Sequence, residues 1–122
     1  MRVRGLRLVI AVPSLAASAA FYRDVLGFAI HEISDPGWRF YVHGDVCIMA
    51  GECPDAPALA TIGDHSYVAY LDVDDVDAYH ARAVAAGVSI LKPLRDEPWG
   101  QREFGLRTVD GHRLMLGQPI PR

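Results

Sequence analysis

The sequence predicts an α+β fold made of two βαβββ modules, and three observations support this prediction. The stretches Leu6 to Ile30 and His65 to Ile90 repeat one order of features: an alternating strand, a polar helix start, a helix that ends at glycine, and a new apolar strand. Three strand-like segments then follow each helix. With 122 residues, of which 51% are hydrophobic, the chain is long enough to fold around its own core without disulfides or metal.

Each module begins with a strand that alternates between apolar and more polar positions. This period of two is typical of a half-buried strand, because successive side chains point to opposite faces of a sheet. The positions expected to face the core are Leu8, Ile10 and Val12 in the first module and Ala69, Leu71 and Val73 in the second.

A helix is expected directly after each of these strands. Ser14 in the first module, and Asp74 or Asp75 in the second, offer the side-chain oxygen that caps a first helical turn. Gly27 and Gly87 follow where a left-handed C-terminal cap is needed. The apolar stripes that should pack on the core are Leu15, Ala19, Tyr22 and Leu26, and then Val76, Tyr79, Ala83 and Ala86.

The remaining strands are separated by turn sequences. Pro36-Gly37, Gly44-Asp45 and Asp110-Gly111 are typical of turns. The predicted strands are 28–33, 37–43 and 45–50 in the first module and 88–94, 101–109 and 112–117 in the second. We therefore expect a single domain, 1–122, with a first module over about 1–51, a link over about 52–64 and a second module over about 65–122.

Charge and cysteine content restrict the partners. A net charge of −3 and a pI near 5.9 argue against nucleic acid or an anionic membrane as partner, because either needs a concentrated basic patch. Cys47 and Cys53 are interpreted as free thiols of a cytoplasmic protein. The N-terminus has the basic, apolar and small-residue order of a secretory signal, but Pro13 interrupts the apolar run, so we expect it to belong to the fold.

Three segments, FYRDVLGF, VDDVDAYHARAVAAGV and EPWGQREFGLRTVDGHRL, resemble the vicinal-oxygen-chelate superfamily of glyoxalases, ring-cleaving dioxygenases and bleomycin-resistance proteins. The last segment is most similar to the bleomycin-resistance proteins, apart from one extra residue, Gln101. The resemblance implies an eight-stranded mixed sheet that curls around a cleft, with a helix outside each half, in a homodimer.

Enzymes of that superfamily hold a divalent metal with one His, Gln or Glu from each of four strands. Counting along the resemblance places these positions at Arg7, Val68, Met115 and Ile48, or at Met49 if the fourth strand slips by one residue. Arginine, aliphatic and thioether side chains are poor ligands for such an ion, so no metal and no other cofactor is expected. None of the histidines falls at a ligand position; they are His31, His43, His65, His80 and His112.

With those positions lacking donors, the predicted cleft is an apolar and aromatic enclosure with a few charges. The residues expected to bind a small-molecule ligand are Arg7, Trp38, Phe40, Ile48, Val68, Tyr70, Trp99, Phe104 and Met115. Further charges from Asp72, Glu103, Arg107 and Arg113 would set orientation. Cys47 is expected on the helix-covered side, and Arg7, Ile48, Val68 and Met115 are expected to converge at the cleft floor.

The resemblance favours a metal-independent binding protein of the bleomycin-resistance type, which sequesters a planar or cationic antibiotic-like compound. No catalytic residue is assigned. One alternative is a metal-dependent glyoxalase-like or dioxygenase-like enzyme that uses His65 or His112 after a shift of register. Another is a metal-free enzyme that uses Asp72 or Glu103, and a third interpretation has Trp99 and Phe104 only packing a hairpin or a dimer interface.

Overall fold

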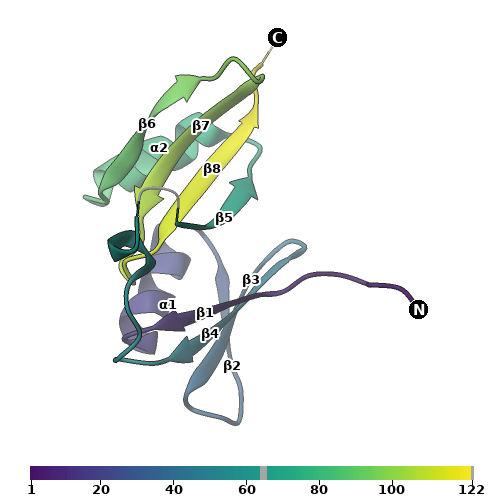
Figure 1. The fold of residues 1–122 in the computed structure, drawn as a ribbon, viewed down its shortest axis with the longest axis vertical. Coiled ribbons are helices and arrows are strands. Elements are labelled where there is room, and N and C mark those ends of the chain that lie inside the picture. Colours follow the sequence, from purple (N-terminus) through teal and green to yellow (C-terminus); the bar gives the residue numbers. More distant parts are fainter. Residues whose placement is uncertain (64–65, 122) are drawn as a thin grey trace. The chain divides into compact units, whose positions relative to one another are not determined.

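The structure is a computed structural model in which residues 1–63 and 66–121 are described (Figure 1). The chain forms two compact units, Met1–Ala56 and Pro57–Arg122, which we call module 1 and module 2. His65, one of the residues considered as an alternative metal ligand, lies outside the described residues. Each described helix is too short or too polar to cross a membrane.

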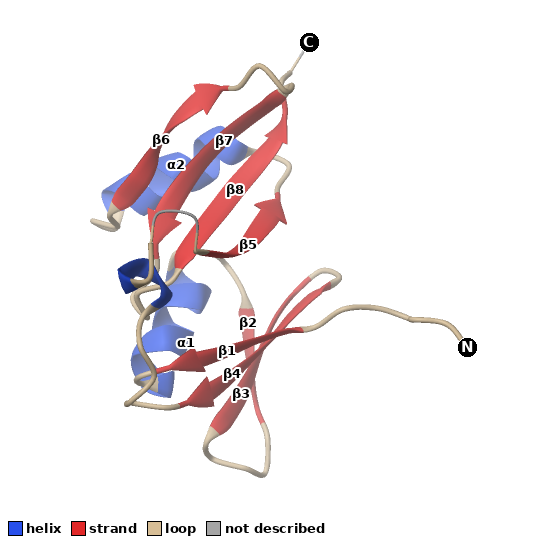
Figure 2. Cartoon of the chain, in the orientation of Figure 1, coloured by secondary structure: helices blue, strands red, loops and turns tan. Residues whose placement is uncertain are grey.

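Module 1 has the order strand, helix, three strands (Figure 2). Its elements are β1 (Leu8–Val12), α1 (Leu15–Asp24), β2 (Ala29–Glu32), β3 (Trp38–His43) and β4 (Val46–Glu52). They form a mixed sheet in the order β1-β4-β3-β2, in which only β1 and β4 run parallel among the described strands.

Module 2 repeats this plan after a short 3-10 turn, η1 (Leu59–Thr61). Its elements are β5 (Tyr67–Asp72), α2 (Val76–Ala85), β6 (Ile90–Asp96), β7 (Gln101–Arg107) and β8 (Arg113–Pro119). The sheet order β5-β8-β7-β6, with β5 parallel to β8, is the same as in module 1. The prediction of two βαβββ modules with mixed sheets and one helix each is confirmed.

Several strand ends differ from the prediction by one or two residues, and two of these differences have a clear cause. β4 runs on to Glu52 because β1 pairs with it as far as Val12 opposite Glu52. β7 ends at Arg107 because Thr108 begins a tight turn, in which its amide donates to the carbonyl of His112 at 2.9 Å.

The helix starts have the expected caps and an additional acceptor each. The side chains of Ser14 and Asp75 accept from amides three residues on, at 3.3 and 3.1 Å. The first amide of each helix donates to a side chain of the last strand in the same module: Glu52 accepts from Leu15 at 3.0 Å, and Gln118 accepts from Val76 at 2.6 Å. Side chains at the ends of β4 and β8 thus satisfy helix N–H groups that would otherwise lack partners.

The core of each module lies between its sheet and its helix. In module 1 the rings of Tyr22 and Tyr41 pack at 4.8 Å, and the Tyr41 hydroxyl donates to Ser18 at 2.8 Å. In module 2 the ring of Phe104 meets that of His80 at 5.1 Å. The fully buried strand residues on these faces include Val12, Ile48, Ala50, Leu106, Leu114 and Leu116.

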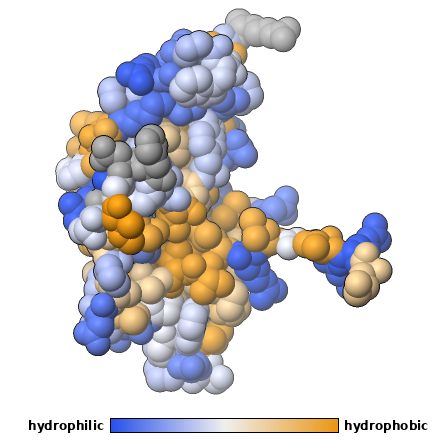
Figure 3. All heavy atoms as spheres, in the orientation of Figure 1, coloured by the Kyte–Doolittle hydropathy of each residue, from blue (hydrophilic) through white to orange (hydrophobic). Residues whose placement is uncertain are grey.

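The opposite face of each sheet, which we call its open face, is less buried. Side chains alternate along a strand, so the open face holds the neighbours of the core residues. Figure 3 shows a group of apolar residues on the surface over β1 and β4 of module 1. Val9 on β1 is 59% exposed.

Two residues predicted to bind ligand lie on the core side instead. Ile48 and Phe104 are both fully buried, so the prediction that either lines the cleft is wrong. Met49, next to Ile48, takes the open-face position opposite Phe40, and Cys47 opposite Val42 lies there too, against the expectation for Cys47. The reason is that β4 reads as a continuous apolar run, in which either register buries apolar groups.

Candidate functional site

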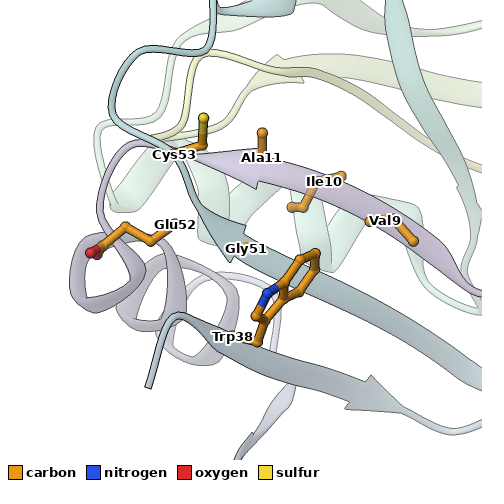
Figure 4. A pocket seen from close by; sticks show the side chains of 7 residues that line it. All are labelled: Val9, Ile10, Ala11, Trp38, Gly51, Glu52 and Cys53. Atoms are coloured by element: carbon orange, nitrogen blue, oxygen red, sulfur yellow. The ribbon is translucent and has the colours of Figure 1, made fainter. Parts of the chain in front are cut away.

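The open face of module 1 carries an apolar pocket at the end of its sheet (Figure 4). Its volume is about 360 Å³, and its lining residues are Val9, Ile10, Ala11, Trp38, Gly51, Glu52 and Cys53. The indole of Trp38 lies over Gly51, which is opposite it in the sheet, so closely that a Cβ on Gly51 would be 2.9 Å from two ring carbons. The missing side chain at Gly51 therefore lets an aromatic ring lie flat against the strand.

This pocket presents little charge. In Figure 4 the Glu52 side chain points away from Trp38, and its carboxylate accepts the amide of Leu15 at the start of α1. The N-terminus of α1 stabilises the Glu52 carboxylate, because N-terminal amides and the helix dipole favour a negative charge. What remains for a ligand is the indole, the aliphatic side chains of Val9, Ile10 and Ala11, and the thiol of Cys53.

The open face of module 2 is built around Glu103 on β7. This residue is 4% exposed, and its side chain accepts three hydrogen bonds from three different segments. The donors and their distances are the Tyr70 hydroxyl at 3.2 Å, the Trp99 indole N–H at 2.9 Å and the Lys92 ammonium at 2.6 Å. Lys92 also contacts Glu97 at 3.2 Å, and Arg95 pairs with Glu97.

These contacts determine the protonation states. Burial of Glu103 works against its ionisation, but hydrogen bonds from Lys92, Trp99 and Tyr70 outweigh it and hold the pKa of this carboxyl below its usual value. Burial and the Glu103 charge raise the pKa of Tyr70 to about 12. An ionised carboxylate with three donors is a poor general acid or base near neutral pH, which disfavours Glu103 as a catalytic group.

Two glycines make this arrangement possible. A Cβ on Gly117 of β8 would lie 2.7 Å from Cζ of Tyr70, so the phenol crosses β8 only because no side chain is there. A Cβ on Gly105 of β7 would lie 3.0 Å from the hydroxyl of Tyr67. Both tyrosines therefore lie across the sheet from β5.

The remaining predicted ligand residues are distributed between the two modules. Trp38 and Phe40 share the open face of module 1, and Arg7 lies exposed just before β1. In module 2, Tyr70 and Met115 are opposed in register on the open face. Trp99 is connected to the same face by its hydrogen bond to Glu103. Met115 lies between the buried Leu114 and Leu116, as the alternation predicts.

Val68 falls where the register between β5 and β8 shifts, so Tyr67 rather than Val68 is opposed to Arg113. The predicted convergence of Arg7, Ile48, Val68 and Met115 fails for Ile48, which faces the helix. For the other three it stays a prediction, because Arg7 belongs to module 1 and the other two to module 2.

Lys92, Tyr67 and the glycines under the rings were not singled out from the sequence. Lys92 lies in β6, whose pairing with β7 contains two irregularities, so alternation along β6 is not a guide to its face. A glycine within a strand often marks a place where another group approaches the backbone closely. Aromatic side chains do so at Gly51, Gly105 and Gly117.

The side chains at the positions that the resemblance assigns to a metal are poor ligands for a divalent ion. With Ile48 turned to the core, those positions carry Arg7, Met49, Val68 or Tyr67, and Met115. No three His, Cys, Asp or Glu side chains within 1–63 and 66–121 are grouped to hold a metal. His43 and His80 pack on the rings of Phe28 and Phe104.

Comparisons with known proteins agree with this fold. Residues 6–116 match the family model of the Glyoxalase/Bleomycin resistance protein/Dioxygenase superfamily. The chain therefore belongs to this superfamily.

Three particular proteins illustrate what the chain is similar to in sequence or in fold. The uncharacterized protein Mb0911c of Mycobacterium bovis is 33% identical over 84 residues, which are 69% of this chain and 54% of that protein. The chain thus spans about half the length of the curated relatives it matches. The fosfomycin resistance protein FosX from Listeria monocytogenes is 21% identical, with a TM-score of 0.78 over 96% of this chain and 92% of that one. Lactoylglutathione lyase from Agrobacterium tumefaciens is also 21% identical, with a TM-score of 0.72 over 96% and 94%.

Proposed function

We propose that this protein sequesters a planar, antibiotic-like small molecule on its aromatic open faces, without a metal and without converting it. The observation that carries the proposal is the set of aromatic rings that are held in position yet exposed. Trp99 is 64% exposed and Tyr70 is 41% exposed although both are hydrogen-bonded to Glu103. Rings fixed in this way offer flat contact area at a small cost in conformational entropy.

Module 1 supports the same proposal with different chemistry. The indole of Trp38 is held over Gly51 at the edge of an apolar pocket. Such concave apolar surfaces with few polar groups are typical of small-molecule sites. A ligand that offers an aromatic plane would gain contact area in either module.

Planarity matters more than positive charge in this proposal. Lys92 neutralises Glu103, and its ammonium already lies 5.5 Å from the centre of the Trp99 ring. A ligand cation would compete with this ammonium for the same indole face. The exposed Asp72 on β5 is the carboxylate through which module 2 would select a cation.

The proposal includes a homodimer in the cytoplasm. The resemblance to dimeric bleomycin-resistance proteins supports the first part, and the two free thiols support the second. The fosfomycin resistance of FosX shows that resistance occurs on this fold, and the proposal extends that kind of role, not that compound, to this chain.

Fluorescence titration with metal-free bleomycin and a panel of planar antibiotics tests the proposal. Trp38→Phe and Trp99→Phe variants assign any change in emission to one indole. We expect saturable quenching by at least one compound, and resistance to that compound on expression. Unchanged emission with every compound, together with no resistance, would show that the protein does not sequester such ligands.

A further inference from the structure

Module 1 has a groove between α1 and β2, the strand at one edge of its sheet. Ile30 of β2 is opposed to the buried Tyr41, so the groove lies on the helix-covered side of the sheet. It shares no lining residue with the open-face pocket beside Trp38. Its volume is about 740 Å³, and its lining residues include Ala16, Ala19, Ala20, Phe28, Ile30 and Arg39.

The floor and the helix wall of this groove are apolar. Ala16, Ala19 and Ala20 lie on one face of α1, because residues three and four apart share a helix face. Each of them contributes only a methyl group toward β2. Ala19 is 3% exposed and Phe28 is 5% exposed, so both lie at the bottom of the groove.

Module 2 has larger side chains at the equivalent positions. The two modules can be compared residue by residue, because both repeat the hydrogen bond between the first helical amide and the end of the last strand. In this comparison His80 takes the place of Ala19, and Phe104 takes the place of Arg39. The rings of His80 and Phe104 pack at 5.1 Å between α2 and its sheet. The groove is therefore a property of the module 1 sequence and not of the fold.

Arg39 brings a positive charge to this groove. Its side chain is 27% exposed, and within residues 1–63 and 66–121 its one ion pair is with Glu32. The two groups are 3.6 Å apart, which is too long for a hydrogen bond, and the Glu32 side chain is 77% exposed. The guanidinium of Arg39 therefore has donors to offer to the acid group of a ligand.

The second arginine of the groove, Arg23, is already paired. Its Nε and Nη2 donate to the two carboxylate oxygens of Asp24 at 2.8 and 3.1 Å. Arg23 is in the last turn of α1, about 10 Å along the helix axis from Ala16. Arg39 is opposed to Ala50, near the end of β4 that bonds to the start of α1. The available positive charge thus lies at one end of an apolar groove.

We propose that this groove binds a monocarboxylate with an apolar chain, whose carboxylate pairs with Arg39 and whose chain lies over Ala19, Ile30 and Phe28. The volume of the groove is in the range of small-molecule sites, and its single loosely paired cation complements one acid group. Arginine and carboxylate form strong charge-assisted hydrogen bonds, and burial of the chain adds a hydrophobic contribution. This site is separate from the aromatic open faces and does not rest on the proposed function.

Calorimetry with three matched probes tests the proposal. The probes are octanoate, its uncharged analogue octanamide, and acetate, which has the acid group without the chain. Octanoate should bind about tenfold more tightly than octanamide, because only the carboxylate accepts charge-assisted hydrogen bonds from Arg39. Acetate should show no saturable binding at millimolar concentration, because it buries almost no apolar surface.

NMR of alanine methyl groups reports where octanoate binds. The methyl signals of Ala16, Ala19 and Ala20 should shift, because these residues line the groove. Ala11 lines the open-face pocket of the same module, so its methyl group is the internal control and should not shift.

Variants make the test specific. Ala20→Leu should lower the affinity for octanoate at least about tenfold, because the larger side chain occupies the groove. Ala17→Leu is the matched control, since Ala17 is an exposed alanine of the same helix that does not line the groove. Arg39→Gln should remove the preference for octanoate over octanamide, whereas Arg23→Gln should keep it. Melting temperatures show whether each variant remains folded.

Several results would overturn the proposal. Equal affinity for octanoate and octanamide contradicts it, and so do equal effects of Ala20→Leu and Ala17→Leu. Shifts confined to Ala11 would place octanoate on the open face instead. If octanoate does not bind and Ala20→Leu alone lowers the sedimentation coefficient of the free protein, a second copy of the chain covers the groove and the proposal is wrong.

Discussion

Tyr70 and Gly117 are neighbours on β5 and β8, and the Tyr70 phenol occupies the space that a side chain on residue 117 would fill. A Cβ there would also lie 3.0 Å from Cβ of Glu103. The hydrogen bond from Tyr70 to Glu103 therefore depends on Gly117, which is neither its donor nor its acceptor.

Gly117→Ala is expected to displace the phenol and break its bonds to Glu103 and Gln101. Overpacking at such a position costs about 1–3 kcal/mol in the free energy of unfolding, which urea denaturation measures. Tyr70→Phe in the same background removes the nearest atom, so the two changes should be less than additive. Additive losses would show that the ring is not held against Gly117.

Glu103→Gln is expected to lower the free energy of unfolding by about 1–3 kcal/mol, since it weakens the bonds from Lys92 and Trp99. The control Glu32→Gln changes an exposed acid 3.6 Å from Arg39 and should cost less than about 0.5 kcal/mol. Similar losses in the two variants would contradict the central position of Glu103.

The loss caused by Glu103→Gln should depend on pH. The pKa of Glu103 is lowered from 4.5 in the folded state, so the ionised group stabilises the fold fully above that value. This contribution disappears as pH falls through the folded-state pKa. Unfolding of wild type and Glu103→Gln from pH 7 to pH 3 should therefore show a difference that shrinks on acidification, and a difference that grows would contradict the assigned charge state.

Gly51→Ala is expected to move the Trp38 indole, because the new methyl group would be 2.9 Å from its ring carbons. In a Trp99→Phe background the emission of Trp38 can be observed by itself, and it should shift in wavelength. Gly5→Ala, before β1 and with nothing within 4 Å of the added Cβ, is the control for a glycine change without ring contact. An unchanged Trp38 spectrum in Gly51→Ala would show that the ring does not lie on this strand.

Removal of the strand acceptors should weaken the helix starts in both modules. Glu52→Ala and Gln118→Ala each leave a first-turn amide, of Leu15 or Val76, without its acceptor, and each should cost about 1 kcal/mol. Glu52→Gln keeps an acceptor oxygen and should recover most of the loss. Equal losses in Glu52→Ala and Glu52→Gln would mean that charge, rather than the hydrogen bond, is what stabilises α1.

Local patterns were enough to predict the elements, the repeat and part of the site. The alternation around Met115 placed it correctly, because leucines flank it on both sides. The same reasoning applied to β7 would have placed Phe104 on the core side, since Glu103, Gly105 and Arg107 occupy the alternate positions. For β4 the pattern carries no such information, because apolar residues occupy both faces from Val46 to Ala50.

The Glu103 cluster was beyond local patterns. Its donors come from β5, from β6 and from the loop before β7, and a single sequence does not show which of these segments meet. That a glutamate is buried, ionised and paired follows only from these long-range contacts. The sequence therefore predicts the face on which several of these side chains lie, but not how their charges are balanced.

The central claim is that the open faces bind a planar compound without a metal. The most direct test is a calorimetric titration of the compound that the antibiotic panel identifies, on protein purified without a histidine tag, before and after removal of divalent ions with EDTA. The account predicts the same affinity and stoichiometry in both titrations. Binding that disappears with EDTA and returns with one equivalent of a divalent ion would contradict it.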